Sequence, residues 1–422
     1  MKVWLVTVGE PLPTDAGHPR LFRTGQLARK LVEEGHEVLW WTSTFDHSLK
    51  QFRRQASESQ EIAEGYRIHY LHGPTGYQKN VSLARIFNHR ELARDFLAQK
   101  DRYQTPDIVV CSYPVIELAY EVAKWATEHK VPVVLDVRDM WPDIFANAVP
   151  APLRLLARIP LFSMERMARA TMKMSSSLVG ITQSYLDWAC NKAARSSTDQ
   201  DHVYHLTSEM ESYPSDVVDL AERFLSESGV DFDKTIVSFV GIISERKFCL
   251  NSLMEEAVQL QKERPDLQFV FAGNGDDLNR FMEKYPELRF LGWIDGPQMQ
   301  ALLAASTIAV APYWSSPEFM QSIPIKIFDY MANGVPVINC LRGEVESLIA
   351  EFKIGIQYSA EEAGSFSRQL IKLIDSSSEL EQMALAAKET FVREFSPQTV
   401  FSKRVSDMET LVRSYKENPD DK

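Results

Sequence analysis

The segment of the sequence that carries the clearest chemistry is residues 318–338, in which a cation and a carboxylate fall on one predicted helix. Pro324 stands in the first turn of this helix, and Gly334 closes it about three turns later. The N–H groups at such a helix start attract a phosphate, and Lys326 supplies a counter-charge. Asp329, one turn further on, is placed to accept hydrogen bonds from the two hydroxyls of a ribose. The pattern indicates a nucleotide diphosphate site, and the alternative is an ordinary helix capped by glycine.

Three predicted strands before this helix each end in a glycine, and the residues beside them could complete the same site. The strand and glycine pairs are 235–240 with Gly241, 268–272 with Gly273 and 288–291 with Gly292. A glycine lets a ligand approach the backbone, so Asn274 and Ile294 in the following turns are candidates to read a base edge. Arg246 and Lys247 precede the next helix and could hold a diphosphate. Each turn alone is a weak signal, because turns between strands and helices often contain glycine.

A second charged cluster follows the predicted strand 132–137 in the first half of the chain. Asp136, Arg138, Asp139 and Asp143 lie within or directly after this apolar strand. Charged residues in such a place are rarely buried without partners. We therefore predict that Arg138 or Asp139 works at a ligand cleft, and the alternative is a structural ion pair.

The loop after the first predicted strand offers a candidate phosphate site. It lacks the GxGxxG fingerprint, which disfavours a dinucleotide dehydrogenase. It ends at Gly17 and His18, and Arg20 and Arg23 stand at the start of the predicted helix 21–34. Two arginines at a helix N-terminus would attract a phosphate, and the alternative is a pair of solvent-facing charges.

The remaining pattern predicts an α/β chain of two Rossmann-like domains that face each other across a cleft. Apolar strands alternate with helix-length segments, which is typical of parallel sheets with helices on both faces. The predicted strands are 3–8, 37–42, 66–71, 107–111, 132–137, 177–181 and 202–206, then 235–240, 268–272, 288–291, 307–311, 335–340 and 355–358. The expected domains are 1–210, a linker 211–232, a second domain 233–395, and a C-terminal helix 396–422 that packs back on the first domain.

Composition excludes several classes of protein. The chain has 422 residues and a net charge of −12, with a balance of about +3 over the first 200 residues and about −15 over the rest. A DNA-binding lobe would be more basic, so no nucleic acid partner is expected. The four cysteines are far apart and form no zinc motif. Neither a signal peptide nor an apolar run of about 18 residues is visible, so we expect a cytoplasmic protein.

Residues 152–173 form a basic amphipathic segment with a net charge of +4 and an internal Pro160. Such a segment is typical of a contact with a membrane surface, here the inner face of the cytoplasmic membrane. The alternative is a domain helix with a basic outer face.

Taken together and in order, these motifs resemble the GT-B glycosyltransferases of family four over nearly the whole chain. The similarity extends to the branch that builds bacterial surface polysaccharides, such as the WbuB-like N-acetyl-fucosamine transferases. The motifs that carry it are Arg23, Leu27-Ala28, Leu31 and 35–38, then 138–142, 239–241 with Lys247, 271–275, 291–293 and 322–338. The chain departs from the family where Gln321 and Asp329 replace a pair of glutamates, where Ile242 replaces an arginine, and where Arg138 replaces a histidine.

The resemblance implies a retaining hexosyl- or N-acetylhexosaminyl-transferase. A nucleotide sugar, with UDP as the first expectation, would bind the second domain, and a glycan or lipid-linked glycan of capsule or O-antigen synthesis would bind the first. Lys247, Lys326 and the backbone of Gln321, Ser322 and Ile323 would hold the diphosphate, and Arg138 or Asp139 would orient a sugar. No protein nucleophile, cofactor or metal is expected. The remaining alternatives are a silent subunit that binds nucleotide sugar, suggested by Gln321 and Ile242, and a nucleotide-sugar epimerase.

Overall fold

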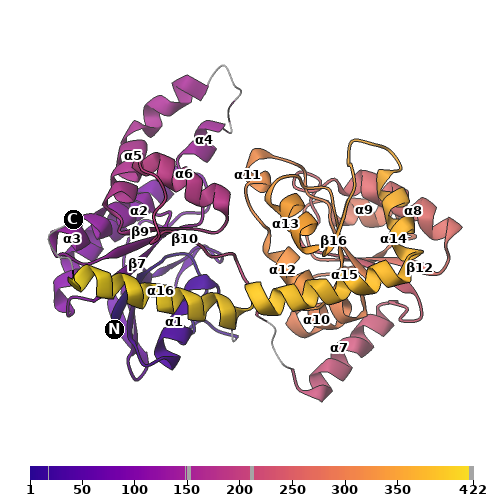
Figure 1. Ribbon diagram of the computed structural model, residues 1–422, viewed down its shortest axis with the longest axis horizontal. Helices are drawn as coiled ribbons and strands as arrows, with labels where there is room; N and C mark the ends of the chain where they lie inside the picture. Colours follow the sequence, from indigo (N-terminus) through magenta and orange to yellow (C-terminus); the bar gives the residue numbers. More distant parts are fainter. Residues whose placement is uncertain (18, 148, 150–153, 210–212, 418–422) are drawn as a thin grey trace. The chain divides into compact units, whose positions relative to one another are not determined.

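The computed structural model describes residues 1–17, 19–147, 149, 154–209 and 213–417. The chain divides into two compact units, Met1–His205 with Val400–Lys422 (unit 1) and Leu206–Thr399 (unit 2). Each unit is built on its own sheet of mainly parallel strands covered by helices, as Figure 1 shows. The predicted α/β class with two Rossmann-like sheets is therefore confirmed.

Unit 1 contains an eight-stranded sheet in the order β10-β9-β8-β7-β1-β2-β6-β5, in which only the edge strand β5 is antiparallel to its neighbour. Its strands are β1 Lys2–Val6, β2 Glu37–Ser43, β5 Glu58–Ala63, β6 Tyr66–Leu71, β7 Ile108–Tyr113, β8 Val133–Val137, β9 Ser177–Gly180 and β10 His202–Val203. A separate hairpin pairs β3 Phe45–Asp46 with β4 Gln51–Phe52. The hairpin and β5 were not predicted, because their polar residues lack the apolar runs of the buried strands.

Helices cover both faces of this sheet, because alternate residues of its strands point in opposite directions. Trp4 stacks on Trp125 of α3 with ring centroids 4.8 Å apart, whereas Val3 packs with Leu27 of α1 and Val405 of α16. The helices of unit 1 are α1 Arg23–Glu33, α2 Leu83–Gln99, η1 Lys100–Arg102, α3 Ile116–Glu128, α4 Asp143–Asn147, α5 Arg154–Met174, α6 Gln183–Ala193 and α16 Pro397–Glu417.

Unit 2 contains a six-stranded, fully parallel sheet in the order β13-β12-β11-β14-β15-β16. Its strands are β11 Thr235–Val240, β12 Leu267–Ala272, β13 Arg289–Gly292, β14 Ile308–Ala311, β15 Val337–Asn339 and β16 Gly355–Gln357. Its helices are α7 Ser215–Glu227, α8 Leu250–Glu263, α9 Leu278–Lys284, α10 Gly296–Ala305, α11 Pro317–Met320, α12 Ile325–Ala332, α13 Glu344–Phe352, α14 Ser365–Ile374, α15 Ser377–Thr390 and η3 Phe391–Phe395.

The segment expected to be a linker, 211–232, instead contains α7, which belongs to the core of unit 2. Ala221 and Leu225 of α7 are buried against Leu302 of α10 and Ile236 of β11. The proline at 214 is therefore the N-cap of a helix and does not mark a domain boundary. The first residue of unit 2 is Leu206.

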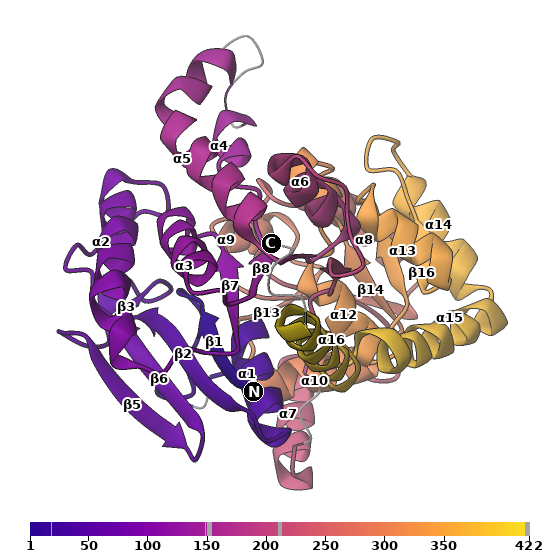
Figure 2. The same ribbon diagram turned by 60° about the vertical axis from the view of Figure 1, so that its left-hand side comes forward.

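The C-terminal helix α16 belongs to unit 1 and runs beside α1 over one face of the sheet (Figures 1 and 2). Its Arg404 is 1% exposed, and the Nη2 atom of this residue lies 3.0 Å from Oδ2 of Asp136 at the end of β8. Arg23 of α1 and Arg138 approach the same carboxylate, each to 2.9 Å. Burial alone would raise the pKa of Asp136, but these guanidinium groups outweigh it and hold the pKa well below the usual range.

We expect Asp136→Asn to lower the free energy of unfolding by about 3–5 kcal/mol, because it leaves buried guanidinium groups without their carboxylate. Because the pKa of Asp136 is depressed in the folded state, its contribution is complete above about pH 4 and is lost as the pH falls through the folded-state value. Denaturant titrations between pH 7 and pH 2 measure both effects. The exposed Asp199→Asn is the control. Equal stability of the two variants would show that the ion pairs of Asp136 with the three arginines do not stabilise the fold.

Candidate functional site

The carboxyl ends of three neighbouring strands in unit 2 interlock through their backbones. The N–H of Gly241 donates to the carbonyl of Ala272 at 2.9 Å, and the N–H of Gly273 donates to the carbonyl of Gly292 at 2.6 Å. Gly273 has a φ of +135°, and a methyl group there would lie 1.8 Å from the carbonyl oxygen of Gly241. Only glycine permits this contact, so the three predicted glycine turns form one continuous backbone surface.

Lys326, in the first turn of α12, points at this surface. A methyl group on Gly241 would lie 2.5 Å from Nζ of Lys326, so the ammonium group sits directly beside the end of β11. Three aromatic rings surround it, with centroids 4.2 Å away at Phe239, 4.4 Å at Phe248 and 5.0 Å at Tyr313. The residue is 9% exposed, and Nζ makes no hydrogen bond to any residue that the structure describes.

This environment weakens the charge of Lys326. Burial lowers the pKa of the ammonium group to about 7, Asp329 opposes the shift, and Lys247 adds to it. Cation–π contacts compensate part of the lost hydration, but no carboxylate lies within 4.0 Å of Nζ among the described residues. The site therefore has a cation that would gain an electrostatic partner from a bound anion.

The start of α12 adds hydrogen-bond donors to the same place. Pro324 is the N-cap, and the first intrahelical bond is that from the N–H of Ile327 to the carbonyl of Pro324. The N–H groups of Ile325 and Lys326 precede this bond and have no carbonyl within the helix to donate to. An anion beside Lys326 would also face the positive end of the helix.

The predicted donors at Gln321, Ser322 and Ile323 need a correction. The short helix α11 ends just before them, and the N–H of Ser322 donates to the carbonyl of Phe319 at 3.2 Å. The Gln321 side chain donates from Nε2 to the carbonyl of Pro317 at 2.8 Å. Ser322 therefore uses its N–H within this turn, and the helix donors belong to α12 instead.

Asp329 lies one turn beyond Lys326 and is 7% exposed. Its Oδ1 accepts a hydrogen bond from the Ser208 hydroxyl, near the start of unit 2. The carboxylate thus already binds an alcohol, which is the kind of donor that a ribose would offer. Ser208 was not predicted, because it lies far from Asp329 in the sequence and in no motif.

The other predicted residues of unit 2 are placed differently. Arg246, Lys247 and Asn274 are exposed in the turns after β11 and β12. The side chain of Ile294 is 8% exposed and packs into the core against α10 and β12, so only its backbone is available to a ligand. The aromatic cage around Lys326 was missed, although Phe239 stands just before Gly241 in the sequence.

In unit 1, the predicted phosphate site at the start of α1 is filled by the protein itself. The Glu10 carboxylate accepts hydrogen bonds from the N–H of Thr24 at 3.0 Å and from its hydroxyl at 2.9 Å. Arg23 is 6% exposed and donates to Asp136 and to the carbonyls of Tyr204 and His205. The prediction that Arg23 binds a phosphate is therefore wrong, because its donors are committed inside the fold.

The remaining residues of that loop are described only in part. Gly17 is exposed with a φ of +83°, and apart from its chain neighbours no described residue has an atom within 4 Å of a methyl group built on it. Arg20 is half-buried, and His18 lies outside the described residues.

Arg138 and Asp139 have structural partners. Arg138 pairs with Glu10 and with Asp136, and it donates to the Thr24 hydroxyl at 2.9 Å. Asp139 accepts hydrogen bonds from the N–H of Met140 at 2.9 Å and from Nε1 of Trp141 at 3.0 Å. These contacts favour the structural alternative for both side chains.

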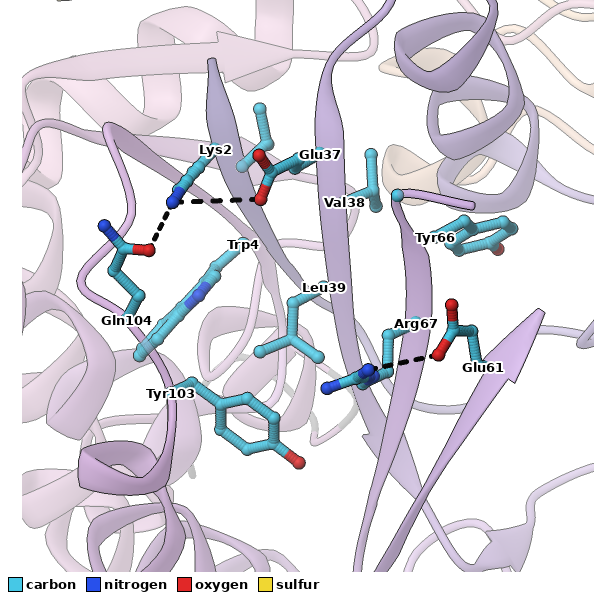
Figure 3. A pocket seen from close by; sticks show the side chains of 12 residues that line it. Lys2, Trp4, Glu37, Val38, Leu39, Glu61, Tyr66, Arg67, Tyr103 and Gln104 are labelled. Atoms are coloured by element: carbon cyan, nitrogen blue, oxygen red, sulfur yellow. Dashed lines mark hydrogen bonds and ion pairs between the residues drawn. The ribbon is translucent and has the colours of Figure 1, made fainter. Parts of the chain in front are cut away.

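A hollow of about 210 Å³ in unit 1 lies at the amino-terminal ends of the strands (Figure 3). It is lined by the first residues of β1, β2 and β6, with Trp4 and Leu39 on its floor. Its charges are paired: Lys2 with Glu37 at 3.9 Å and Arg67 with Glu61 at 3.2 Å. Ligands of parallel sheets bind at the carboxyl ends of the strands, so this hollow is not the candidate site.

Two sequence models of protein families match the chain. Residues 22–192 match the glycosyl transferase 4-like domain, and residues 234–376 match the glycosyl transferases group 1. No curated protein sequence matches the chain at a significant level.

Solved structures with the same fold cover almost the whole chain. A sucrose-phosphate synthase from Thermosynechococcus elongatus aligns with a TM-score of 0.72 at 15% identity, over 98% of this chain and 99% of that one. HepE from Anabaena in complex with UDP aligns with a TM-score of 0.63 at 14% identity, over 97% and 100%. WaaG, described as a glycosyltransferase of lipopolysaccharide biosynthesis, aligns with a TM-score of 0.60 at 13% identity, over 95% and 98%.

We expect Lys326→Met to stabilise the unliganded protein at pH 7, because it replaces a buried cation without a carboxylate by an apolar chain of similar length. A lysine whose folded-state pKa is lowered to about 7 destabilises the folded protein to the full extent below pH 7. This loss of folding free energy disappears as the pH rises toward 10.5, the ordinary pKa of lysine. The gain should therefore be on the order of a few kcal/mol at pH 6 and shrink by pH 10. Denaturant titrations measure it, with the exposed Lys372→Met on α14 of the same unit as control, and a destabilised Lys326→Met at pH 6 would contradict the account.

Proposed function

We propose that the chain is a group 1 glycosyltransferase of GT-B fold, and that it transfers a sugar from a nucleotide diphosphate, with UDP as the first candidate, to a glycan or lipid-linked glycan. The observation that carries the donor assignment is Lys326, a buried ammonium group beside the Gly241 backbone with no hydrogen-bond partner among the described residues. The diphosphate would lie beside Nζ at the start of α12, and the ribose would reach Asp329.

The proposed chemistry uses these groups to stabilise the leaving group. Cleavage of the bond to the sugar builds negative charge on the terminal phosphate of the departing nucleotide diphosphate. Lys326 and the N–H groups that begin α12 are fixed before the reaction, so they stabilise this charge without reorganising. The departing phosphate can itself accept the proton of the acceptor hydroxyl. The configuration of the sugar is then retained without a protein nucleophile, and neither a cofactor nor a metal is required.

A role in bacterial surface polysaccharide synthesis is part of the same proposal. It is supported by the motif resemblance, which includes the WbuB-like transferases, and by the fold shared with WaaG. UDP is favoured because the similar HepE structures contain UDP, UDP with glucose, and UDP-glucose. The acceptor would then be a growing glycan, presented on unit 1.

A thermal-shift screen against UDP-, GDP- and dTDP-sugars tests the donor site without knowledge of the acceptor. A ligand that binds only the folded protein raises the melting temperature, so one nucleotide series should do so. Asp329→Ala should weaken that binding by roughly 1–3 kcal/mol, or about 5- to 150-fold, because a charged acceptor of the ribose hydroxyls is lost.

The control for this variant is Glu389→Gln, an exposed change on α15 of the same unit. Unchanged donor affinity in Asp329→Ala would remove the residue from the ribose site. A wild-type protein that responds to none of the nucleotides would refute the donor assignment. Release of free sugar from the bound donor distinguishes an active transferase from a subunit that only binds.

We also propose that α5 contacts an anionic membrane surface. Its second half is anchored by the buried Met164, Ala168 and Met172, whereas Ile159 and Phe162 are each 69% exposed. Arg158, Arg166, Arg169 and Lys173 are also exposed on this helix. Exposed apolar side chains among cations suit the headgroup region of a bilayer. None of the helices in the described part of the chain is long and apolar enough to cross a membrane.

Replacing both Ile159 and Phe162 by serine should reduce binding to vesicles that contain about 30% phosphatidylglycerol, because two apolar anchors are lost. Flotation of vesicles with bound protein measures the effect. The matched control replaces the exposed Leu220 and Leu385 of unit 2 by serine. Equal binding by both double variants, or no binding by the wild type, would contradict a contact through α5.

A further inference from the structure

Unit 1 contains two neighbouring cations that have no carboxylate partner. Arg85, in the first turn of α2, and Lys50, between β3 and β4, lie more than 4.0 Å from every carboxylate oxygen among the described residues. The nearby Arg53 shows the usual arrangement, because it pairs with Asp15 and with Asp46 at 2.7 Å each. No carboxylate of a described residue therefore forms an ion pair with Arg85 or Lys50.

The two cations converge on the same two residues. Nζ of Lys50 donates to Oδ1 of Asn80 at 2.6 Å, and Nη1 of Arg85 donates to the carbonyl of Asn80 at 2.7 Å. Both also face the ring of Tyr77, at 5.2 Å and 5.8 Å from its centroid. The Trp141 ring lies 4.7 Å from the guanidinium carbon of Arg85 and supports it from another side.

The histidines beside them are held neutral and add no charge. His47 lies 2.8 Å from the Tyr77 hydroxyl and 3.4 Å from Nζ of Lys50, and His89 accepts from Nε of Arg85 at 3.3 Å. Burial, reinforced by Arg85, lowers the pKa of His47 to about 4 and that of His89 to about 3. Both imidazoles can therefore accept or donate a hydrogen bond at neutral pH.

Two acidic residues near the cluster, Asp46 and Asp139, have other partners, whereas Oε2 of the buried Glu117 lies 3.8 Å from Nδ1 of His89. Asp46 pairs with Arg53 and accepts from the N–H groups of Ser48 and Leu49. Asp139 interacts with Arg85 only over a longer distance, and its oxygens accept from Met140 and Trp141. Burial and Arg85 lower the pKa of Lys50, and Asp46 opposes this shift without reversing it.

We infer that Arg85 and Lys50 bind a phosphate or diphosphate group of the acceptor substrate, a role that rests on the proposed function of unit 1. A planar guanidinium can form two parallel hydrogen bonds to phosphate oxygens, and a nearby ammonium supplies a second point charge. This cluster takes the place of the phosphate site predicted at Arg23.

The surface around the cluster indicates what the phosphate is attached to. Four large apolar side chains next to its members in the sequence are exposed, and they are Leu49 at 67%, Val81 at 74%, Leu83 at 73% and Phe87 at 53%. Such a group of apolar side chains beside paired cations suits an anionic headgroup on a hydrocarbon chain. A prenyl diphosphate should therefore bind more tightly than inorganic pyrophosphate.

Titration of the full-length protein with geranyl diphosphate, inorganic pyrophosphate and geraniol, followed by calorimetry, tests the inference. We expect geranyl diphosphate to bind most tightly and geraniol least. Arg85→Gln and Lys50→Gln should each weaken geranyl diphosphate by at least about tenfold, because each removes a charged hydrogen-bond donor. Exposed Arg94→Gln on the same helix is the matched control and should bind as the wild type does.

Two further measurements separate this inference from the donor proposal. Lys326→Met should still bind geranyl diphosphate, and Arg85→Gln should still show the thermal shift with the nucleotide sugar. Equal affinity for pyrophosphate and geranyl diphosphate would keep the phosphate site but exclude the lipid chain. Unchanged affinity in Arg85→Gln, equal losses in Arg85→Gln and Arg94→Gln, or loss of binding in Lys326→Met would overturn the inference.

Discussion

The candidate site of unit 2 centres on one electrostatic imbalance: the Lys326 ammonium group is buried among aromatic rings, and no described residue accepts a hydrogen bond from it. A buried cation of this kind is costly, and folds normally pair it. Gly241 has no side chain, and a methyl group at this position would lie 2.5 Å from Nζ of Lys326 and block it. The glycine turns, the aromatic cage and the start of α12 together surround this cation.

In unit 1, the charged residues at the start of α1 and the end of β8 are paired with one another. The Glu10 carboxylate accepts a hydrogen bond at the start of α1, and Asp136 forms ion pairs with Arg23, Arg138 and Arg404. These ion pairs commit Arg23 and Arg138 inside the fold, so neither side chain is available to bind an anion there. Arg85 and Lys50 of the same unit have no carboxylate oxygen within 4.0 Å among the described residues, and aromatic rings and neutral histidines lie beside them.

The fold could be predicted from the sequence because buried parallel strands appear as continuous apolar runs, and glycines mark the ends of these runs. The prediction that Lys326, Asp329 and Gly241 lie near one another rests on the same pattern. Prediction from the sequence failed where the partner of a side chain lies far away in the chain. Nothing near Arg23 shows that Asp136 will neutralise it, and nothing near Asp329 points to Ser208. The α7 helix was missed because its apolar face is narrow, with only Ala221 and Leu225 buried.

The position of Arg404 has a consequence for how the chain is made. Unit 2 is one continuous stretch and can fold as soon as it leaves the ribosome. The larger part of unit 1 is synthesised before unit 2, yet the helix that brings Arg404 to Asp136 is translated after unit 2. The N-terminal unit must therefore wait, with part of its core open, until the whole of its neighbour has been synthesised.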